Sequence, residues 1–269
     1  MQANPLEAPG DWAVAMNDLG TVVGIDCTYE ESLDTGEPIG WETAFVRPGG
    51  TIPGKPSEAA AINRRGQVVG TACTAKGCHA FVWQKGRLTD LGTLGGKSSR
   101  AVAINDDGAV VGSSATKSGA VHAFLWQKGR MSDLGTLGGA TSEAVAINRR
   151  DQVVGWSDTR GKSATGQHAV LWQSGRAIDL GAWESGSPPV SSLGDADGGP
   201  ALNERGQVVG QSGGSAVLWQ GGRLTRLPLL PGAKGSAALA INEHDQIVGW
   251  SNGTEYGSHA VLWTLKPGA

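Results

Sequence analysis

The sequence predicts an all-β fold built from six copies of one unit of four short antiparallel strands. The first observation is a phrase that recurs along the chain: Ala, then Ile, Met or Leu, then Asn, a turn, and a β-branched pair followed by Gly. Its asparagines lie 46, 42, 43, 55 and 39 residues apart, at Asn17, Asn63, Asn105, Asn148, Asn203 and Asn242. The second is composition, with 43 Gly in 269 residues and 17 % charged residues, which favours a turn-rich β chain over disorder. A period of about 40 residues with this composition is typical of the blades of a β-propeller.

The unit at residues 101–139 shows how one blade is expected to form. The turn after the first strand, Asn105 to Gly108, supplies residues that adopt positive φ. Short runs of apolar and β-branched residues before and after it favour strands. The four strands are expected at residues 101–104, 109–113, 122–126 and 131–137.

The six units are expected to form one domain, residues 1–269. Their approximate ranges are 13–57, 58–99, 100–142, 143–197, 198–236 and 237–269. The last unit ends at Trp263 and Leu265 without a fourth strand, whereas the N-terminal residues 1–12 are spare. We expect an N-terminal strand to complete the last blade, which would close the ring and remove an exposed sheet edge. A degenerate seventh blade at residues 181–200 is the alternative, but that stretch is too rich in Gly, Ser and Pro to supply four strands.

Three motifs recur in a fixed order and resemble the HAF repeat, which is named for its His-Ala-Phe strand. They are Cys78-His79-Ala80-Phe81-Val82-Trp83, Asp90 to Gly96, and Ala103-Ile104-Asn105. The resemblance covers about residues 13–265 and implies a bacterial, often exported, repeat protein with a propeller-like fold and no defined reaction. The chain departs from the pattern at Thr43 and Ser215, which replace the motif His, and at Arg47, which replaces the motif Trp. The fourth-strand motif is missing from the first, fifth and sixth units.

The net charge, the length of the apolar runs and the absence of known motifs also exclude several classes of function. A net charge of −3 offers no basic surface for nucleic acid. No apolar run reaches the roughly 18 residues of a membrane-spanning helix, and no cofactor-binding motif is visible. Residues 1–12 show no signal peptide, so the protein either stays in the cytosol or is a mature chain from an extracellular or periplasmic compartment. We expect a monomer without a cofactor.

Several repeated columns are expected to be structural. The histidines occur one per blade, so they should lie too far apart to converge on one metal ion. A bond from each His to a blade turn or backbone is the simpler interpretation. The His column is His79, His122, His168 and His259. The tryptophans at 83, 126, 172, 219 and 263 should pack between blades.

Function is expected where the repeats differ. Two insertions, residues 25–43 and 182–200, follow even-numbered strands, so both should lie on the same face of an up-and-down fold. Aromatic residues outside the repeated columns map to that face, which predicts a ligand-binding surface. They are Trp12, Tyr29, Trp41, Trp156, Trp183, Trp250 and Tyr256. The alternative is that some of these tryptophans only cap the hydrophobic ends of blades.

One position on the innermost strand varies while its neighbours do not. It lies five residues before each repeated Asn and holds Trp12, Glu58, Arg100, Glu143, Gly198 and Ala237. Glu58, Arg100 and Glu143 come from successive blades and could hold a polar ligand, or place an acid and a base. A solvated ion pair is the alternative interpretation.

The hairpin register predicts a disulfide. A short turn in the fifth unit should place Gly210 opposite Val217. The same register in the second unit places Gly70 opposite Phe81 and Cys73 opposite Cys78. Directly opposed residues lie close enough for a disulfide, which would favour an oxidising compartment. Cys27 is left as a passive thiol, because no base accompanies it.

These observations favour a binding protein for a small molecule, glycan or peptide at the loop-rich face and central funnel. A cofactor-independent lyase, cyclase or hydrolase is the alternative, with Glu58 or Glu143 as acid or base and Arg100 stabilising an anion. A structural surface protein without a pocket is the third interpretation.

Overall fold

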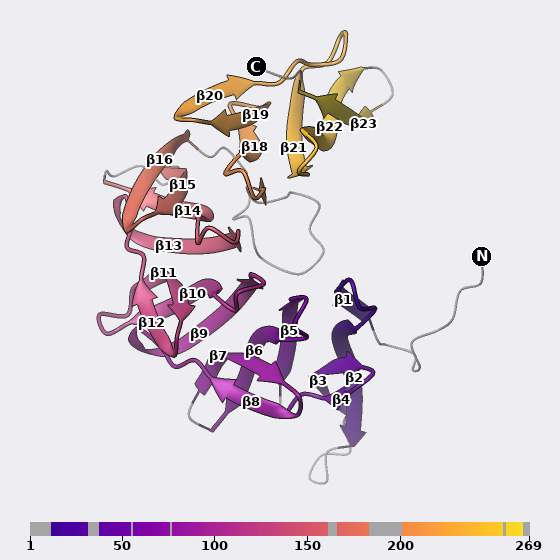
Figure 1. The fold of residues 1–269 in the computed structure, drawn as a ribbon, viewed down its shortest axis with the longest axis vertical. Helices are drawn as coiled ribbons and strands as arrows, with labels where there is room; N and C mark the ends of the chain where they lie inside the picture. The colour runs from indigo at the N-terminus through magenta and orange to yellow at the C-terminus, as the bar shows by residue number, and fades with distance from the viewer. Residues whose placement is uncertain are drawn as a thin grey trace, which may run out of the picture. The chain divides into compact units, whose positions relative to one another are not determined.

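The computed structural model describes residues 12–31, 38–54, 56–75, 77–160, 166–182, 201–254 and 257–265. These residues form six antiparallel sheets that follow one another along the chain, and none of them is helical (Figure 1). Five sheets have four strands each, and the last has three. The described residues accordingly include no helix long and apolar enough to cross a membrane.

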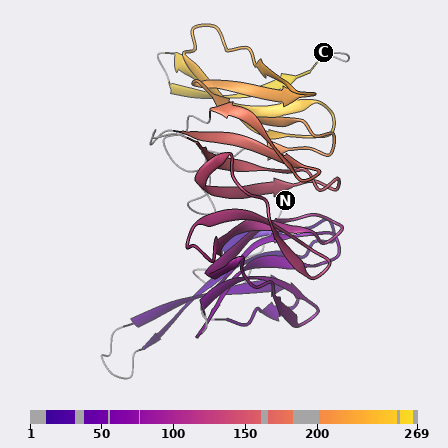
Figure 2. The same ribbon diagram turned by 90° about the vertical axis from the view of Figure 1, so that its left-hand side faces the viewer.

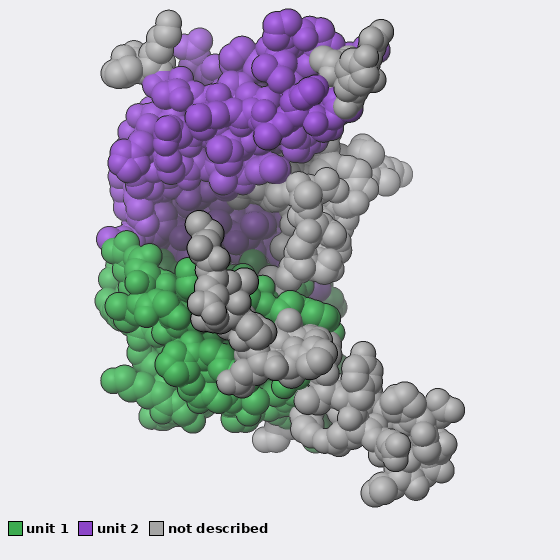
Figure 3. Space-filling view, turned by 90° about the vertical axis from the view of Figure 1, so that its right-hand side faces the viewer, with its two compact units in different colours: residues 1–120, 125–132 green, residues 121–124, 133–269 purple. Residues whose placement is uncertain are grey.

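The chain divides into two compact units, which Figure 3 colours separately. The first unit comprises residues 1–120 and 125–132, and the second unit comprises residues 121–124 and 133–269.

The strands of the first three sheets have the following bounds. The first sheet contains β1 (Trp12–Met16), β2 (Val22–Glu31), β3 (Pro38–Arg47) and β4 (Gly50–Thr51). The second contains β5 (Ser57–Ile62), β6 (Val68–Thr74), β7 (Gly77–Gln84) and β8 (Arg87–Asp90). The third contains β9 (Gly95–Ile104), β10 (Val110–Thr116), β11 (Val121–Gln127) and β12 (Arg130–Asp133).

The last three sheets belong to the second unit. The fourth contains β13 (Gly138–Ile147), β14 (Val153–Thr159), β15 (Gln167–Gln173) and β16 (Arg176–Ala182). The fifth contains β17 (Ala201–Leu202), β18 (Val208–Ser212), β19 (Ser215–Gln220) and β20 (Arg223–Arg226). The sixth contains β21 (Gly235–Ile241), β22 (Gln246–Thr254) and β23 (Gly257–Thr264). In every sheet, strands that are consecutive in sequence pair side by side.

The fourth strand predicted for the third repeat, residues 131–137, is too long at its C-terminal end. The strand stops at Asp133, and the residues up to Leu137 leave the sheet. Gly135, which lies within this stretch, adopts a φ of 72°, in the left-handed region outside the β region. The link then runs into the next sheet, where Leu137 forms a parallel bridge with Thr159.

The first predicted insertion, residues 25–43, extends a hairpin. β2 and β3 have ten residues each and pair without a register shift from Val22↔Arg47 to Glu31↔Pro38. Figure 2 shows the two strands continuing past the rest of their sheet. The second predicted insertion, residues 182–200, lies outside the described residues apart from Ala182, which ends β16.

The glycine of each Val-Val-Gly phrase allows the second strand to approach the first very closely. In the third sheet, a Cβ at Gly112 would collide with the carbonyl oxygen of Arg100, opposite a shift in the strand register. A Cβ at Gly70 would collide in the same way with the carbonyl oxygen of Glu58, and one at Gly155 with that of Glu143. The residue whose side chain varies between repeats is therefore the one whose backbone carbonyl packs against the glycine.

The repeated asparagines join neighbouring sheets as well as shaping turns. The Oδ1 atom of Asn63 accepts hydrogen bonds from the backbone N–H groups of Arg65 and Gln67, which is the predicted turn role. Its Nδ2 donates to the backbone oxygen of Asn105 in the next sheet, at 3.0 Å. In the first unit Asn17 donates in the same way to Asn63. In the second unit the chain of bonds runs from Asn148 to Asn203 to Asn242.

Buried serines provide a second link between sheets. The Ser99 hydroxyl on β9 accepts a hydrogen bond from the backbone N–H of Ala80 on β7 and donates one to the carbonyl of Gly92. Ser57 on β5 and Ser142 on β13 make the equivalent hydrogen bonds to the preceding sheet and link. Apolar side chains also pack between the sheets: Val23 and Ala44 of the first sheet pack with Val68, Phe81 and Trp83 of the second.

Candidate functional site

The variable position lies directly opposite the residue that follows each Val-Val-Gly glycine. Opposed residues of an antiparallel pair share a face, so each described repeat places two side chains together at this end of its first two strands. The pairs are Trp12↔Ile25, Glu58↔Thr71, Arg100↔Ser113, Glu143↔Trp156 and Ala237↔Trp250. Gly198 lies outside the described residues.

In the first unit this arrangement brings opposite charges of two sheets together. The guanidinium of Arg100 lies 3.7 Å from the carboxylate of Glu58, and the two side chains are 33 % and 39 % exposed. This separation is longer than a hydrogen bond, so the pair is loose and both groups keep bonding capacity. Glu143 belongs to the second unit, and its predicted meeting with Arg100 stays a prediction.

A polar atom without a partner lies beside this pair. The hydroxyl of Thr71, across the strands from Glu58, is buried and makes no hydrogen bond. A buried hydroxyl left unpaired costs about 1–3 kcal/mol, so such groups call for a specific explanation. We name Glu58, Arg100 and Thr71 the strand-end cluster.

The predicted aromatic surface is only partly described. Trp12 is 50 % exposed, and Trp250 is half-buried. Trp156 is only 8 % exposed and packs in the interior, so its ring contributes no stacking surface in this structure. The side chains of Tyr29 and Trp41, and all of Trp183 and Tyr256, lie outside the described residues.

The predicted hairpin register is found in the structure. Gly210 pairs with Val217, and Gly70 pairs with Phe81. The same hairpin pairs Cys73 with Cys78, and a disulfide joins their sulfur atoms at 2.04 Å.

Thiol labelling checks the disulfide in solution. We expect the unfolded, unreduced protein to take up one label, at Cys27, because the other two cysteines are bonded to each other. After reduction it should take up three. Intact mass spectrometry distinguishes these results, and three labels without reduction would contradict the disulfide.

Each described His of the second, third and fourth sheets pairs with an aspartate eleven residues later. Nδ1 of His79 lies 2.9 Å from the carboxylate of Asp90, which also accepts a hydrogen bond from the backbone N–H of Gly92. His122 with Asp133, and His168 with Asp179, repeat the arrangement. Sequence reasoning missed the aspartate partner, although the His and the Asp change together along the chain. In the fifth sheet Ser215 replaces the His, and Arg226 occupies the position equivalent to the Asp.

The His–Asp pairs therefore have a structural role, tying the third and fourth strands of a sheet together. Among the residues that the structure describes, no group of three or more His, Cys, Asp or Glu side chains is placed to hold a metal ion.

Charged side chains also cross between neighbouring turns. In the second unit, the guanidinium of Arg205 lies 2.8 Å from the carboxylate of Asp245. Hydrogen bonds from Arg205 and then Gln207 lower the pKa of Asp245 below its usual 3.8. The carboxylate of Asp245 therefore stays ionised at neutral pH, and its ion pair with Arg205 weakens only in solution acidic enough to protonate it.

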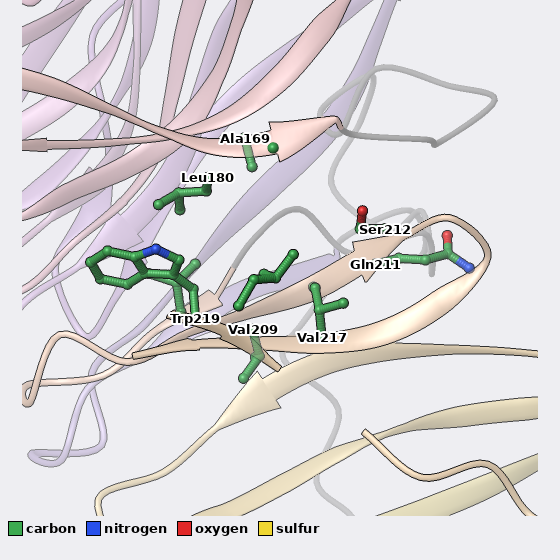
Figure 4. Close-up of a pocket in the computed structure, with 11 residues that line it drawn as sticks. Ala169, Leu180, Val209, Gln211, Ser212, Val217 and Trp219 are labelled. Atoms are coloured by element: carbon green, nitrogen blue, oxygen red, sulfur yellow. The ribbon is translucent and has the colours of Figure 1, made fainter. Parts of the chain in front are cut away.

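A pocket in the second unit is too small for a ligand. It lies between the fourth and fifth sheets, with Leu180 and Trp219 at one end and Gln211 and Ser212 at the other (Figure 4). Its volume of about 20 Å³ has room for about one water molecule.

No protein-family model matches the sequence, and no curated protein matches it. Similar solved structures include TolB from Acinetobacter baumannii, with a TM-score of 0.47 and 14 % identity, covering 77 % of this chain and 50 % of that chain. The present chain thus spans half the length of that protein. The SapL1 lectin in complex with alpha methyl fucoside has a TM-score of 0.37 and 14 % identity, covering 96 % and 82 % of the two chains. A mutant of the Aleuria aurantia lectin in complex with alpha-methyl-L-fucoside has a TM-score of 0.37 and 13 % identity, covering 95 % and 96 %.

Proposed function

We propose that this protein is a β-propeller of the HAF-repeat type that binds a small polar ligand, such as a glycan, peptide or metabolite, at the strand-end cluster. The observation that carries the proposal is the conjunction of Glu58, Arg100 and the unpaired hydroxyl of Thr71 at one strand end. A loose ion pair offers both a donor fork and an acceptor to a ligand, and binding of the ligand could give Thr71 its missing partner.

Ligand binding can be tested with a panel of sugars, short peptides and metabolites. We expect a saturable change in tryptophan fluorescence or melting temperature with at least one class, weakened about tenfold or more in Arg100→Ala, because a charged hydrogen bond is lost. Arg87→Ala is the matched control, since Arg87 is an exposed arginine of the same unit on β8. No response across the panel would favour the structural interpretation, and equal loss in both variants would reject this location.

Acid/base catalysis in the same place remains the alternative. Glu58→Gln keeps the shape of the side chain and removes its ability to exchange a proton. Turnover lost with binding retained would identify an enzyme, whereas loss of binding alone supports the binding function.

The proposal includes a closed ring of six blades. The last sheet has three strands, and its edge strand β23 exposes residues whose counterparts are buried elsewhere. Leu262 is 58 % exposed, whereas the equivalent Leu171 of β15 is fully buried. A fourth strand from the N-terminal segment would cover this edge. That segment lies outside the described residues.

Deleting residues 1–10 tests closure. We expect the melting temperature to fall by several degrees, because the truncated chain would lose a paired strand and re-expose a sheet edge. Removing the C-terminal residues 266–269 is the control and should change it little. An unchanged melting temperature in the first variant would contradict the closure.

A further inference from the structure

The link between the first two sheets is shorter than the links that follow it. Ile52, Leu91 and Leu134 are equivalent residues, because each donates its backbone N–H to the alanine carbonyl of the third strand. From there to the next buried serine, the chain has four intervening residues after Ile52, and seven after both Leu91 and Leu134. The missing residues correspond to Thr-Leu-Gly in the longer links.

In the longer links, this Thr-Leu-Gly segment lies against the end of the second strand of the next sheet. The backbone N–H of Leu94 donates to the hydroxyl of Ser114, and Leu94 forms a parallel bridge with Thr116. Leu137 makes the same bond to Ser157 and the same bridge to Thr159. This packing of the Thr-Leu-Gly segment against the second strand is therefore a repeated structural feature.

Where the link is short, a cavity takes its place. The residues equivalent to Ser114 and Thr116 in the second sheet are Ala72 and Thr74, and both line a cavity of about 160 Å³. Pro53 and Gly54 of the short link form another wall. The loss of the segment coincides with the loss of the serine hydroxyl that would bind it.

The lining of the cavity indicates what it accepts. Ala72, Phe81 and Leu88 make it apolar, whereas the imidazole of His79 and the carboxylate of Asp90 provide hydrogen-bonding groups at its wall. A leucine side chain would fill the apolar part. Its amide N–H, which finds a hydroxyl in the other links, could here donate to the carboxylate of Asp90.

We propose that this cavity binds a peptide segment with a leucine-sized aliphatic side chain, in the manner of Thr93–Leu94–Gly95 in the next link. The site is independent of the strand-end cluster. Ala72 and Phe81 face the first sheet, where they pack with Val23 and Ala44, whereas Glu58 meets Arg100 of the third sheet.

The probe is the peptide acetyl-Thr-Leu-Gly-Gly-amide, followed by amide chemical shifts in NMR spectra of the whole chain. We expect saturable shifts at Thr74 and Gly77, which line the cavity. The peptide with Ala in place of Leu should bind at least about tenfold more weakly, because three buried carbon atoms are removed. Absence of saturable shifts, or equal affinity for both peptides, would overturn the proposal.

Three variants locate the binding. Ala72→Leu should fill the cavity and abolish the shifts, whereas Lys117→Ala, at an exposed site in the turn between β10 and β11, should retain them. Insertion of Thr-Leu-Gly after Pro53 together with Ala72→Ser restores the longer link, and it should abolish binding and raise the melting temperature. This insertion variant tests the proposal if Ala72→Leu does not fold. Peptide affinity unchanged in a folded, filled variant would overturn the proposal.

Discussion

Alanine in place of Gly112 is expected to lower the melting temperature by roughly 6–12 °C, which corresponds to about 3 kcal/mol for a chain of this size. The added Cβ would overlap the carbonyl oxygen of Arg100 on the neighbouring strand. Because the obstacle is backbone, no side-chain rotation relieves the overlap, and the two strands must separate. Thermal unfolding followed by circular dichroism measures the effect.

Gly129→Ala is the control for this substitution. Gly129 adopts a φ of 78° but has open space where a Cβ would lie. Its replacement should cost only the backbone strain of about 1–2 kcal/mol. A Gly112 variant no less stable than the Gly129 variant would show that the close approach of β9 and β10 is not required.

Alanine in place of Asn63 is the second substitution with a large expected effect, about 3 kcal/mol of unfolding free energy. The side chain is only 4 % exposed and holds two backbone N–H groups of its own turn and the carbonyl of Asn105. Each group left unpaired in the interior costs about 1–3 kcal/mol, with water satisfying some of them. Chemical denaturation measures the loss.

Gln84→Ala provides the comparison, since its amide makes one exposed hydrogen bond to the carbonyl of Arg65. We expect a change of about 0.5 kcal/mol there. Equal effects in the two variants would mean that the bond between sheets adds nothing to the local turn.

The sequence predicted those features that depend on short-range spacing. Strand order within a sheet and the β6–β7 register follow from alternation and turn length, and the pairing of Cys73 with Cys78 follows from that register. The error at Leu134–Leu137 has the same origin. The alternating pattern there resembles a strand, but Gly135 adopts positive φ and interrupts it.

Contacts between sheets were harder to predict. The turn role of Asn63 is local, whereas its bond to Asn105 spans 42 residues and depends on how neighbouring sheets are spaced. The strand-end cluster was predicted in part: Glu58 and Arg100 were expected to meet, but nothing in the sequence indicated that the hydroxyl of Thr71 would be left without a partner.

The collision that excludes a side chain at Gly112 involves the carbonyl of Arg100 and not its guanidinium, and the same holds for Gly70 with Glu58 and Gly155 with Glu143. The close packing of the strands therefore depends on the backbone of the variable residue, whereas its side chain takes no part in that packing. A combinatorial library randomised at positions 58, 100 and 143 would leave the glycines and their carbonyl partners untouched, so most of its members should still fold. The same separation lets the side chains at these positions change during evolution while the close strand packing is kept.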